Sequence, residues 1–187
     1  MKNLSILHVD SEKLLPETMK MWAELYCEIW KEPPWNEDFW KPREVKGEFR
    51  KELSRPHGEA FLALENQKVV GFTHGYSVSC QEMREVAGNG LLNKLFKHTN
   101  RVYYIDELGV AKEYRGRHIS IDLTNSLIQA VKCHGITCIT LRTDMQAMAA
   151  RNLYQKLGFK ELKVCDAKYP NRTYWVCQTN EVYDYLR

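Results

Sequence analysis

The stretch that decides the fold reads Glu107-Leu108-Gly109-Val110, then Tyr114-Arg115-Gly116-Arg117-His118-Ile119-Ser120, and finally Leu153-Tyr154-Gln155-Lys156-Leu157-Gly158-Phe159. The aliphatic and aromatic run from Val102 to Val110 predicts a strand, and Thr137 to Leu141 predicts another. Between them, apolar residues from Ile119 to Val131 recur at helical spacing, and Gly135 suits the left-handed residue that ends a helix. A strand, a basic loop, a helix and a strand therefore follow one another.

The basic loop is predicted to form a helix N-terminus. Backbone N–H groups at residues 115–120 would have no partner inside the helix and would carry the positive end of its dipole, so a pyrophosphate could accept several of them. Arg115 and Arg117 add charge that a phosphate can use directly. The alternative is a solvated basic turn, which two arginines beside one glycine form more often.

The third segment predicts a second helix that ends at Gly158. Thr143 and Gln146 have the spacing of a capping box, with Asp144 as an alternative N-cap. Met148, Leu153, Tyr154 and Leu157 supply its apolar positions.

Together these segments resemble the GNAT superfamily of acyl-CoA-dependent N-acyltransferases. The family's phosphate loop reads Arg or Gln, two residues, Gly, one residue, then Gly or Ala. Here His118 and Ser120 stand at the two small positions, and Ala147 stands where many members carry asparagine. The resemblance implies an α/β (α+β) fold with a mixed, largely antiparallel central sheet of about seven strands and helices on both faces. Strands four and five would be parallel and splayed apart.

The resemblance also implies a binding site for acetyl-CoA, the acyl donor. Backbone groups of Leu108, Gly109 and Val110 would align pantetheine and polarise the acyl carbonyl. The remaining cofactor-binding residues implied by the family motif are Arg115, Gly116, Arg117, His118, Ile119 and Ser120.

Two catalytic residues are expected on the same basis. Tyr154 matches the family tyrosine, and a phenol with a pKa of about 10 stays protonated at neutral pH and can donate to a departing thiolate. The alternative is that its ring only packs under the cofactor. Glu107 could accept the amine proton, although a structural carboxylate explains it equally well.

Aromatic and acidic residues gather near Pro33-Pro34, where related folds place the acceptor. Tyr26, Trp30 and Trp35 are the substrate-binding candidates, since acidic and aromatic groups together could select a cationic amine. Helix packing would explain these aromatics as well.

The remaining elements are predicted from shorter patterns. Ser5 to Val9 predicts a strand, and two hairpin strands should flank Asn66-Gln67. The other predicted elements are helices at 19–30 and 37–53, a short helix around Leu91, Leu92, Leu95 and Phe96, and strands at 162–165 and 173–177.

Composition limits the remaining functional classes. A chain of 187 residues with 44% hydrophobic content suits one domain, 1–187, and a net charge of +3 argues against nucleic acid as the main partner. No apolar run approaches the roughly 20 residues of a membrane span, so we expect a cytoplasmic protein with no membrane partner. Six cysteines without a CxxC pair indicate free thiols, and Cys133, His134 and Cys138 are too few to predict a metal site.

The sequence therefore predicts an enzyme that transfers acetyl from acetyl-CoA to a primary amine of a small molecule or peptide, by direct attack in a ternary complex. The alternative is a catalytically degenerate GNAT-fold module that binds CoA or a protein. A homodimer joined through sheet edges and Val182, Tyr183 and Tyr185 is a further possibility. An oxidoreductase is a distant third, because Gly88-Asn89-Gly90 lacks the third glycine of a dinucleotide fingerprint.

Overall fold

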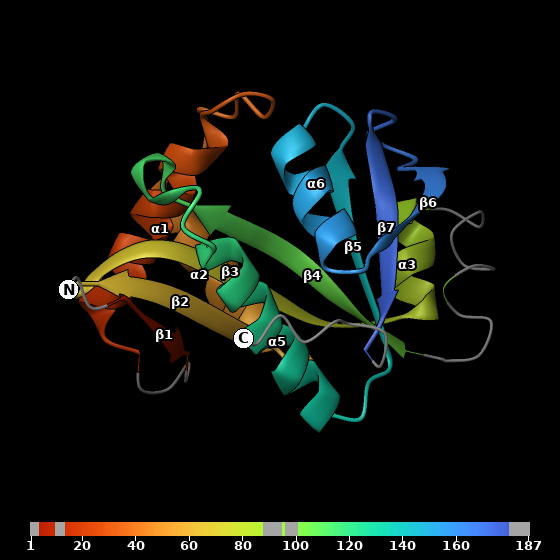
Figure 1. Ribbon diagram of the computed structural model, residues 1–187, viewed down its shortest axis with the longest axis horizontal. Coiled ribbons are helices and arrows are strands. Elements are labelled where there is room, and N and C mark those ends of the chain that lie inside the picture. The colour runs from red at the N-terminus through yellow and green to blue at the C-terminus, as the bar shows by residue number, and fades with distance from the viewer. Residues whose placement is uncertain (1–3, 10–13, 88–94, 96–100, 180–187) are drawn as a thin grey trace. The chain divides into compact units, whose positions relative to one another are not determined.

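The computed structural model describes residues 4–9, 14–87, 95 and 101–179. Within these ranges, seven strands form one sheet in the order β1-β2-β3-β4-β5-β7-β6 (Figure 1). The strands are β1 (Leu4–His8), β2 (Glu59–Glu65), β3 (Lys68–Ser79), β4 (Arg101–Val110), β5 (Cys138–Asp144), β6 (Lys160–Cys165) and β7 (Arg172–Gln178). The helices are α1 (Pro16–Trp30), α2 (Pro42–Leu53), α3 (Cys80–Ala87), α5 (Ile119–Cys133) and α6 (Met148–Lys156).

The sheet is mixed and mostly antiparallel, as the family resemblance implies. β1 with β2, β2 with β3, β5 with β7 and β6 with β7 are antiparallel, whereas β4 and β5 are parallel. The parallel register joins Tyr103–Ile105 of β4 to Ile139–Leu141 of β5, and in the described part of the chain it extends no further along β4. The predicted fold class is confirmed.

Residues of the chain group into two compact units. The first contains Met1–Gly75 and Glu107–Leu127, and the second contains Tyr76–Asp106 and Ile128–Arg187. Both β3 and β4 continue from one unit into the other. The single domain 1–187 remains a prediction.

In the first unit, helices cover both faces of β3 because its side chains alternate in direction. A Cβ atom at Gly71 would lie 3.3 Å from Ile119 of α5. The next residue, Phe72, instead packs among aromatic rings of α1 and α2, with ring centroids 6.1 Å from Trp22 and 6.4 Å from Phe49. The small face of β3 therefore admits α5, as the alternation of small and bulky residues predicts.

The hairpin between β2 and β3 has a turn of two left-handed residues. Asn66 and Gln67 have φ of 51° and 66°, which suits a two-residue turn between twisted strands. The predicted hairpin around Asn66-Gln67 is confirmed.

In the second unit, a separate apolar cluster lies between α3 and the sheet. It contains Tyr76 and Val78 of β3, Met83 of α3, Val102 of β4 and Tyr174 of β7, among others. The neighbouring residue Trp175 is also buried and faces Tyr154 of α6, with ring centroids 6.3 Å apart. Alternation along β7 thus gives this unit helices on both faces as well.

Two local predictions differ from the structure. The second helix begins at Pro42 rather than residue 37, because proline favours the first helical turn and forces the preceding Lys41 to be extended (ψ 137°). α6 begins at Met148 with no side-chain cap, and Asp144 instead accepts a hydrogen bond from the Gln146 N–H (2.7 Å). A helix that was not predicted, α3, follows β3 directly at Cys80–Ala87, and Leu95 of the predicted short helix is helical.

Several predictions fall outside the described residues. They are the helical positions Leu91, Leu92 and Phe96, the glycine pair in Gly88-Asn89-Gly90, and the C-terminal Val182, Tyr183 and Tyr185. Among the described helices, none combines the length and the apolar character that crossing a bilayer requires.

Candidate active site

The loop before α5 presents a row of free backbone N–H groups. Its turn depends on two residues with positive φ, Gly116 (77°) and His118 (64°). The His118 carbonyl accepts hydrogen bonds from the N–H groups of Ile121 (2.9 Å) and Asp122 (3.1 Å), which starts the helix. In the described part of the chain, the backbone N–H groups of residues 116–120 donate no hydrogen bond. Five successive donors at the positive end of a helix form a suitable site for an anion.

His118 adopts a left-handed backbone conformation (φ 64°), which glycine reaches most readily. Histidine is one of the few side chains enriched in the left-handed region, and His118 is exposed, so its ring meets no packing obstacle. The loop therefore keeps the glycine-like path with histidine in place.

Arg115 does not point freely into solvent. Its two terminal nitrogens contact both carboxylate oxygens of Glu32 (2.7 Å and 3.0 Å), and its Nε donates to the Val110 carbonyl (3.0 Å). Glu32 lies just after α1, so this pair joins the end of α1 to the end of β4.

Arg117 also has a carboxylate partner. One terminal nitrogen lies 2.7 Å from Glu65, whose side chain is 2% exposed, and the guanidinium lies 5.2 Å from the Tyr114 ring centroid. Both loop arginines are thus already paired within the protein, which differs from the expectation that their charges are directly available to a phosphate.

The β4 segment before the loop is held tightly by side chains. A Cβ atom at Gly109 would lie 2.8 Å from both Ile29 and Phe72, so only glycine fits without movement. Thr73, fully buried in β3, donates its hydroxyl hydrogen to the Glu107 carbonyl (2.9 Å). The backbone of Leu108, Gly109 and Val110 therefore has a defined path, as expected of a segment that positions a thioester.

Glu107 and Tyr26 are brought together within the first unit. The Tyr26 hydroxyl donates to the partly buried Glu107 carboxylate at 3.4 Å. Tyr26 stacks on Trp30 (4.4 Å), which in turn stacks on Trp35 (6.2 Å). Because Tyr26 and Trp30 are 6% and 8% exposed, packing accounts for most of their surface, whereas Trp35 is partly buried against the same core.

Tyr154 belongs to the second unit. It lies in α6, is 7% exposed, and packs its ring near Phe159 (5.8 Å) and Trp175 (6.3 Å). Packing around the ring is thus evident, while the catalytic role of the hydroxyl remains a prediction.

Sequence reasoning missed the carboxylates that engage the loop arginines. Glu32 and Glu65 lie 83 and 52 residues from their partners, a separation that no local pattern reveals. It also missed the buried cluster of Arg142, Asp166 and Tyr174 in the second unit, for the same reason.

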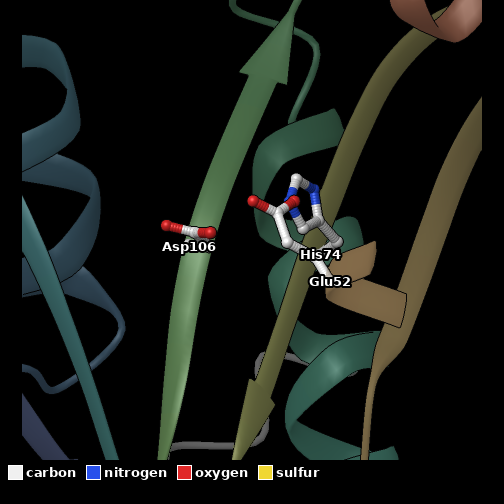
Figure 2. A group of neighbouring side chains, drawn as sticks. All are labelled: Glu52, His74 and Asp106. Carbon is white, nitrogen blue, oxygen red and sulfur yellow. The ribbon is translucent and has the colours of Figure 1, made fainter. Parts of the chain in front are cut away.

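A buried histidine in the first unit is a further unpredicted feature. The His74 side chain is fully buried, and its Nε2 lies 2.9 Å from a Glu52 oxygen. Figure 2 shows the two side chains next to each other. Asp106, also drawn there, belongs to the second unit and accepts a hydrogen bond from the Tyr76 hydroxyl (2.9 Å). Glu52 and His74 offer two ligand atoms, fewer than protein metal sites commonly use. The expectation of no metal remains a prediction.

The cysteines agree with the sequence-based expectation. All six are free thiols, with Cys27, Cys138 and Cys177 buried and Cys133 and Cys165 exposed.

Comparison with known proteins gives four matches. Residues 19–159 match the model of the Acetyltransferase (GNAT) family. The chain is 28% identical over 137 residues to N-alpha-acetyltransferase 30 of Schizosaccharomyces pombe, covering 66% of this chain and 81% of that protein. Its fold resembles a chain in the structure of the NatC complex bound to Gag peptide and CoA (17% identity, TM-score 0.67, 95% and 99% of the two chains). It also resembles the PaiA N-acetyltransferase of Thermoplasma acidophilum in complex with coenzyme A (16%, 0.66, 93% and 99%).

Proposed function

This chain belongs to the Acetyltransferase (GNAT) family, and from that premise we propose that it transfers an acetyl group from acetyl-CoA to the α-amino group of a peptide or protein. The observation that carries the proposal is the row of free N–H groups at residues 116–120. They suit the diphosphate of coenzyme A, because several backbone donors and a helix dipole act on one anion. CoA-bound structures of the same fold support the cofactor.

The choice of acceptor rests on the relatives. N-alpha-acetyltransferase 30 is named for acetylation of an α-amino group, and the similar chain of NatC belongs to a complex bound to a peptide. An aminoglycoside N-acetyltransferase shares the fold at 15% identity, so a small-molecule amine is the alternative acceptor. A partner subunit, as in the NatC complex, is part of the same proposal.

Residues of this chain have separate tasks in the reaction. Acetyl-CoA supplies an activated acyl group as a thioester. Backbone groups of Leu108, Gly109 and Val110 hold the acyl carbonyl and polarise it. Glu107, oriented by the Tyr26 hydroxyl, accepts the proton that the amine must lose.

The transfer step exchanges one bond to the acyl carbon for another and moves two protons. The amine nitrogen forms a bond to the carbonyl carbon, the bond from that carbon to sulfur breaks, and the sulfur leaves as a thiolate. Tyr154 gives the thiolate a proton, since a phenol is protonated at neutral pH. Direct transfer needs no covalent acyl-enzyme and gains mainly from orientation of the two reactants.

The test combines binding and turnover. We expect calorimetry to detect acetyl-CoA binding, and thiol release to be faster with peptides that have a free N-terminus than with Nα-blocked peptides containing lysine. Tyr154→Phe should lower kcat by about 10²- to 10⁴-fold with acetyl-CoA affinity preserved. Tyr169→Phe, at an exposed tyrosine of the same unit, is the matched control and should change neither.

Other outcomes have definite meanings. Binding of acetyl-CoA with no thiol release across peptides, polyamines and aminoglycosides would favour the degenerate module. Absence of acetyl-CoA binding would refute the proposal.

A further inference from the structure

We propose that Glu32 is a positioning residue of the enzyme. By holding Arg115, it fixes the turn at residues 31–37 to the loop at residues 115–118 before α5, called the cofactor loop below. The inference rests on the proposed function and assigns Arg115 to this link rather than to the diphosphate. The anion is then left to the backbone N–H groups of residues 116–120.

Arg115 is held in a geometry that uses the shape of its guanidinium. Two parallel contacts reach Glu32 (2.7 Å and 3.0 Å) while Nε binds the Val110 carbonyl (3.0 Å). Such a fork orients the side chain in a plane, which a lysine of the same charge cannot reproduce. Arg115 therefore links the Val110 carbonyl at the end of β4 to the Glu32 carboxylate.

Glu32 also organises the turn that follows α1. Its N–H donates to the Ile29 carbonyl (3.1 Å), and its own carbonyl accepts the N–H groups of Trp35 (3.1 Å) and Asn36 (3.2 Å). Glu32 thus contributes three of the backbone hydrogen bonds of this turn, which the Glu37 N–H and the Trp30 carbonyl also close (2.8 Å), and its carboxylate attaches the turn to Arg115.

Tyr26 of α1 and Glu32, just after α1, attach to opposite ends of the segment 107–110, which is expected to hold the thioester. The Tyr26 hydroxyl contacts Glu107 at the first residue of this segment, and Glu32 reaches Val110 at the last through Arg115. The stack of Tyr26, Trp30 and Trp35 connects these attachments along α1. Loss of the Glu32 link should therefore loosen the turn that carries the partly buried Trp35, one of the expected substrate-binding residues, without removing a cofactor ligand.

Kinetics of three variants test this assignment. We expect Glu32→Gln, Arg115→Gln and Arg115→Lys each to raise the acceptor KM about fivefold, the size of one half-exposed bidentate ion pair. The Kd for acetyl-CoA should change less than twofold, and the double variant Glu32→Gln with Arg115→Gln should be no worse than either single change.

The opposite pattern would overturn the inference. If Arg115 binds the diphosphate, Arg115→Gln should weaken acetyl-CoA about tenfold or more, Arg115→Lys should retain most affinity as a point charge, and Glu32→Gln should leave binding unchanged or tighter.

Hydrogen exchange provides a readout that needs no activity. Amides of Trp35 and Asn36 should exchange faster in both Glu32→Gln and Arg115→Gln, while Glu113→Gln, an exposed glutamate 3.8 Å from Lys68, should leave them unchanged. Unaltered exchange at these amides in Arg115→Gln would also overturn the inference. Should the wild-type chain bind no acetyl-CoA, the proposed function fails, and the exchange data still decide whether the link exists.

Discussion

Two arginine–carboxylate pairs in this molecule have similar distances and different surroundings. Arg115 and Glu32 in the first unit have side chains 44% and 30% exposed, whereas Arg142 and Asp166 in the second unit have side chains 19% and 0% exposed. Half-exposed pairs contribute little because water competes for both charges. Removing one partner of a buried pair lowers the free energy of unfolding far more, because the remaining charge is neither paired nor hydrated. Burial, rather than distance, therefore separates an adjustable link from a fixed structural centre.

Asp166 is the centre of the buried pair because it satisfies four donors. One oxygen accepts from Arg142 (2.8 Å) and the Tyr174 hydroxyl (2.6 Å), and the other accepts the backbone N–H groups of Lys168 (2.9 Å) and Tyr169 (2.8 Å). Burial acts to raise the pKa of Asp166, but hydrogen bonds from Tyr174 and Arg142 outweigh it and lower this pKa below its usual value. Burial, and then this carboxylate, raise the pKa of Tyr174. The connection between β6 and β7 is thus anchored by one residue.

The largest expected effect is the removal of that carboxylate. Asp166→Ala should lower the free energy of unfolding by about 3–5 kcal/mol, because it leaves the mostly buried Arg142 guanidinium without its carboxylate partner. Glu32→Gln should cost about 1 kcal/mol at most. Urea denaturation of both variants measures these two losses of unfolding free energy. Equal losses would contradict the claim that burial distinguishes the two ion pairs.

A second variant tests whether Gly109, just before the cofactor loop, is packed too closely to accept a side chain. Gly109→Ala places a Cβ atom 2.8 Å from Ile29 and Phe72 side chains and should cost about 1–3 kcal/mol through overpacking. Gly47→Ala in α2 is the control, since nothing lies within 4 Å there, and it should stabilise by about 0.5–1 kcal/mol. If the denaturation midpoints of Gly109→Ala and Gly47→Ala shifted in the same direction, the claim that a side chain at residue 109 causes overpacking would be contradicted.

Lowering the pH should reduce the difference in the free energy of unfolding between the wild type and Asp166→Asn. Its pKa is lowered in the folded protein, so its stabilisation is fully present above the unfolded value of about 3.9 and is lost as pH falls through the folded pKa. Stability curves of the wild type and Asp166→Asn should therefore run parallel near neutral pH and converge only below about pH 4. If the two stability curves converged at pH 5–6, a titratable group other than Asp166 would be responsible for the pH dependence.

The smallest expected effect concerns the loop itself. His118→Gly removes a side chain from a left-handed residue (φ 64°) and should stabilise the protein by about 1 kcal/mol, with acetyl-CoA affinity preserved or improved. Gly116→Ala, at φ 77° in open space, should destabilise by a similar amount. A large loss of affinity in His118→Gly on calorimetry would show that the imidazole itself has a role at the site.

Much of the fold was predictable because its signals are local. The periodicity from Ile119 to Val131, the turn residues Asn66-Gln67 and the left-handed Gly135 (φ 70°) all act over a few neighbouring positions. The start of α2 at Pro42 was misjudged, because the polar and aromatic residues before it have no clear period.

The candidate site was only partly predictable for a related reason. The order of strand, glycine-containing loop and helix indicates an anion site through backbone donors that any side chain carries. The partners of its charged side chains depend on residues far away in the chain, such as Glu32 for Arg115 and Glu65 for Arg117. Sequence spacing contains no information about such pairs.

The sequence by itself determined the family, the order of the elements and the helix start at which an anion can bind, because periodicity, turn chemistry and motif spacing are properties of neighbouring residues. The tertiary structure alone decided which charges are already neutralised and which aromatics lie in the core. It placed Tyr26 and Trp30 in the core and gave both loop arginines a carboxylate partner. Burial and long-range pairing arise when distant segments pack together, and these contacts determine the energies.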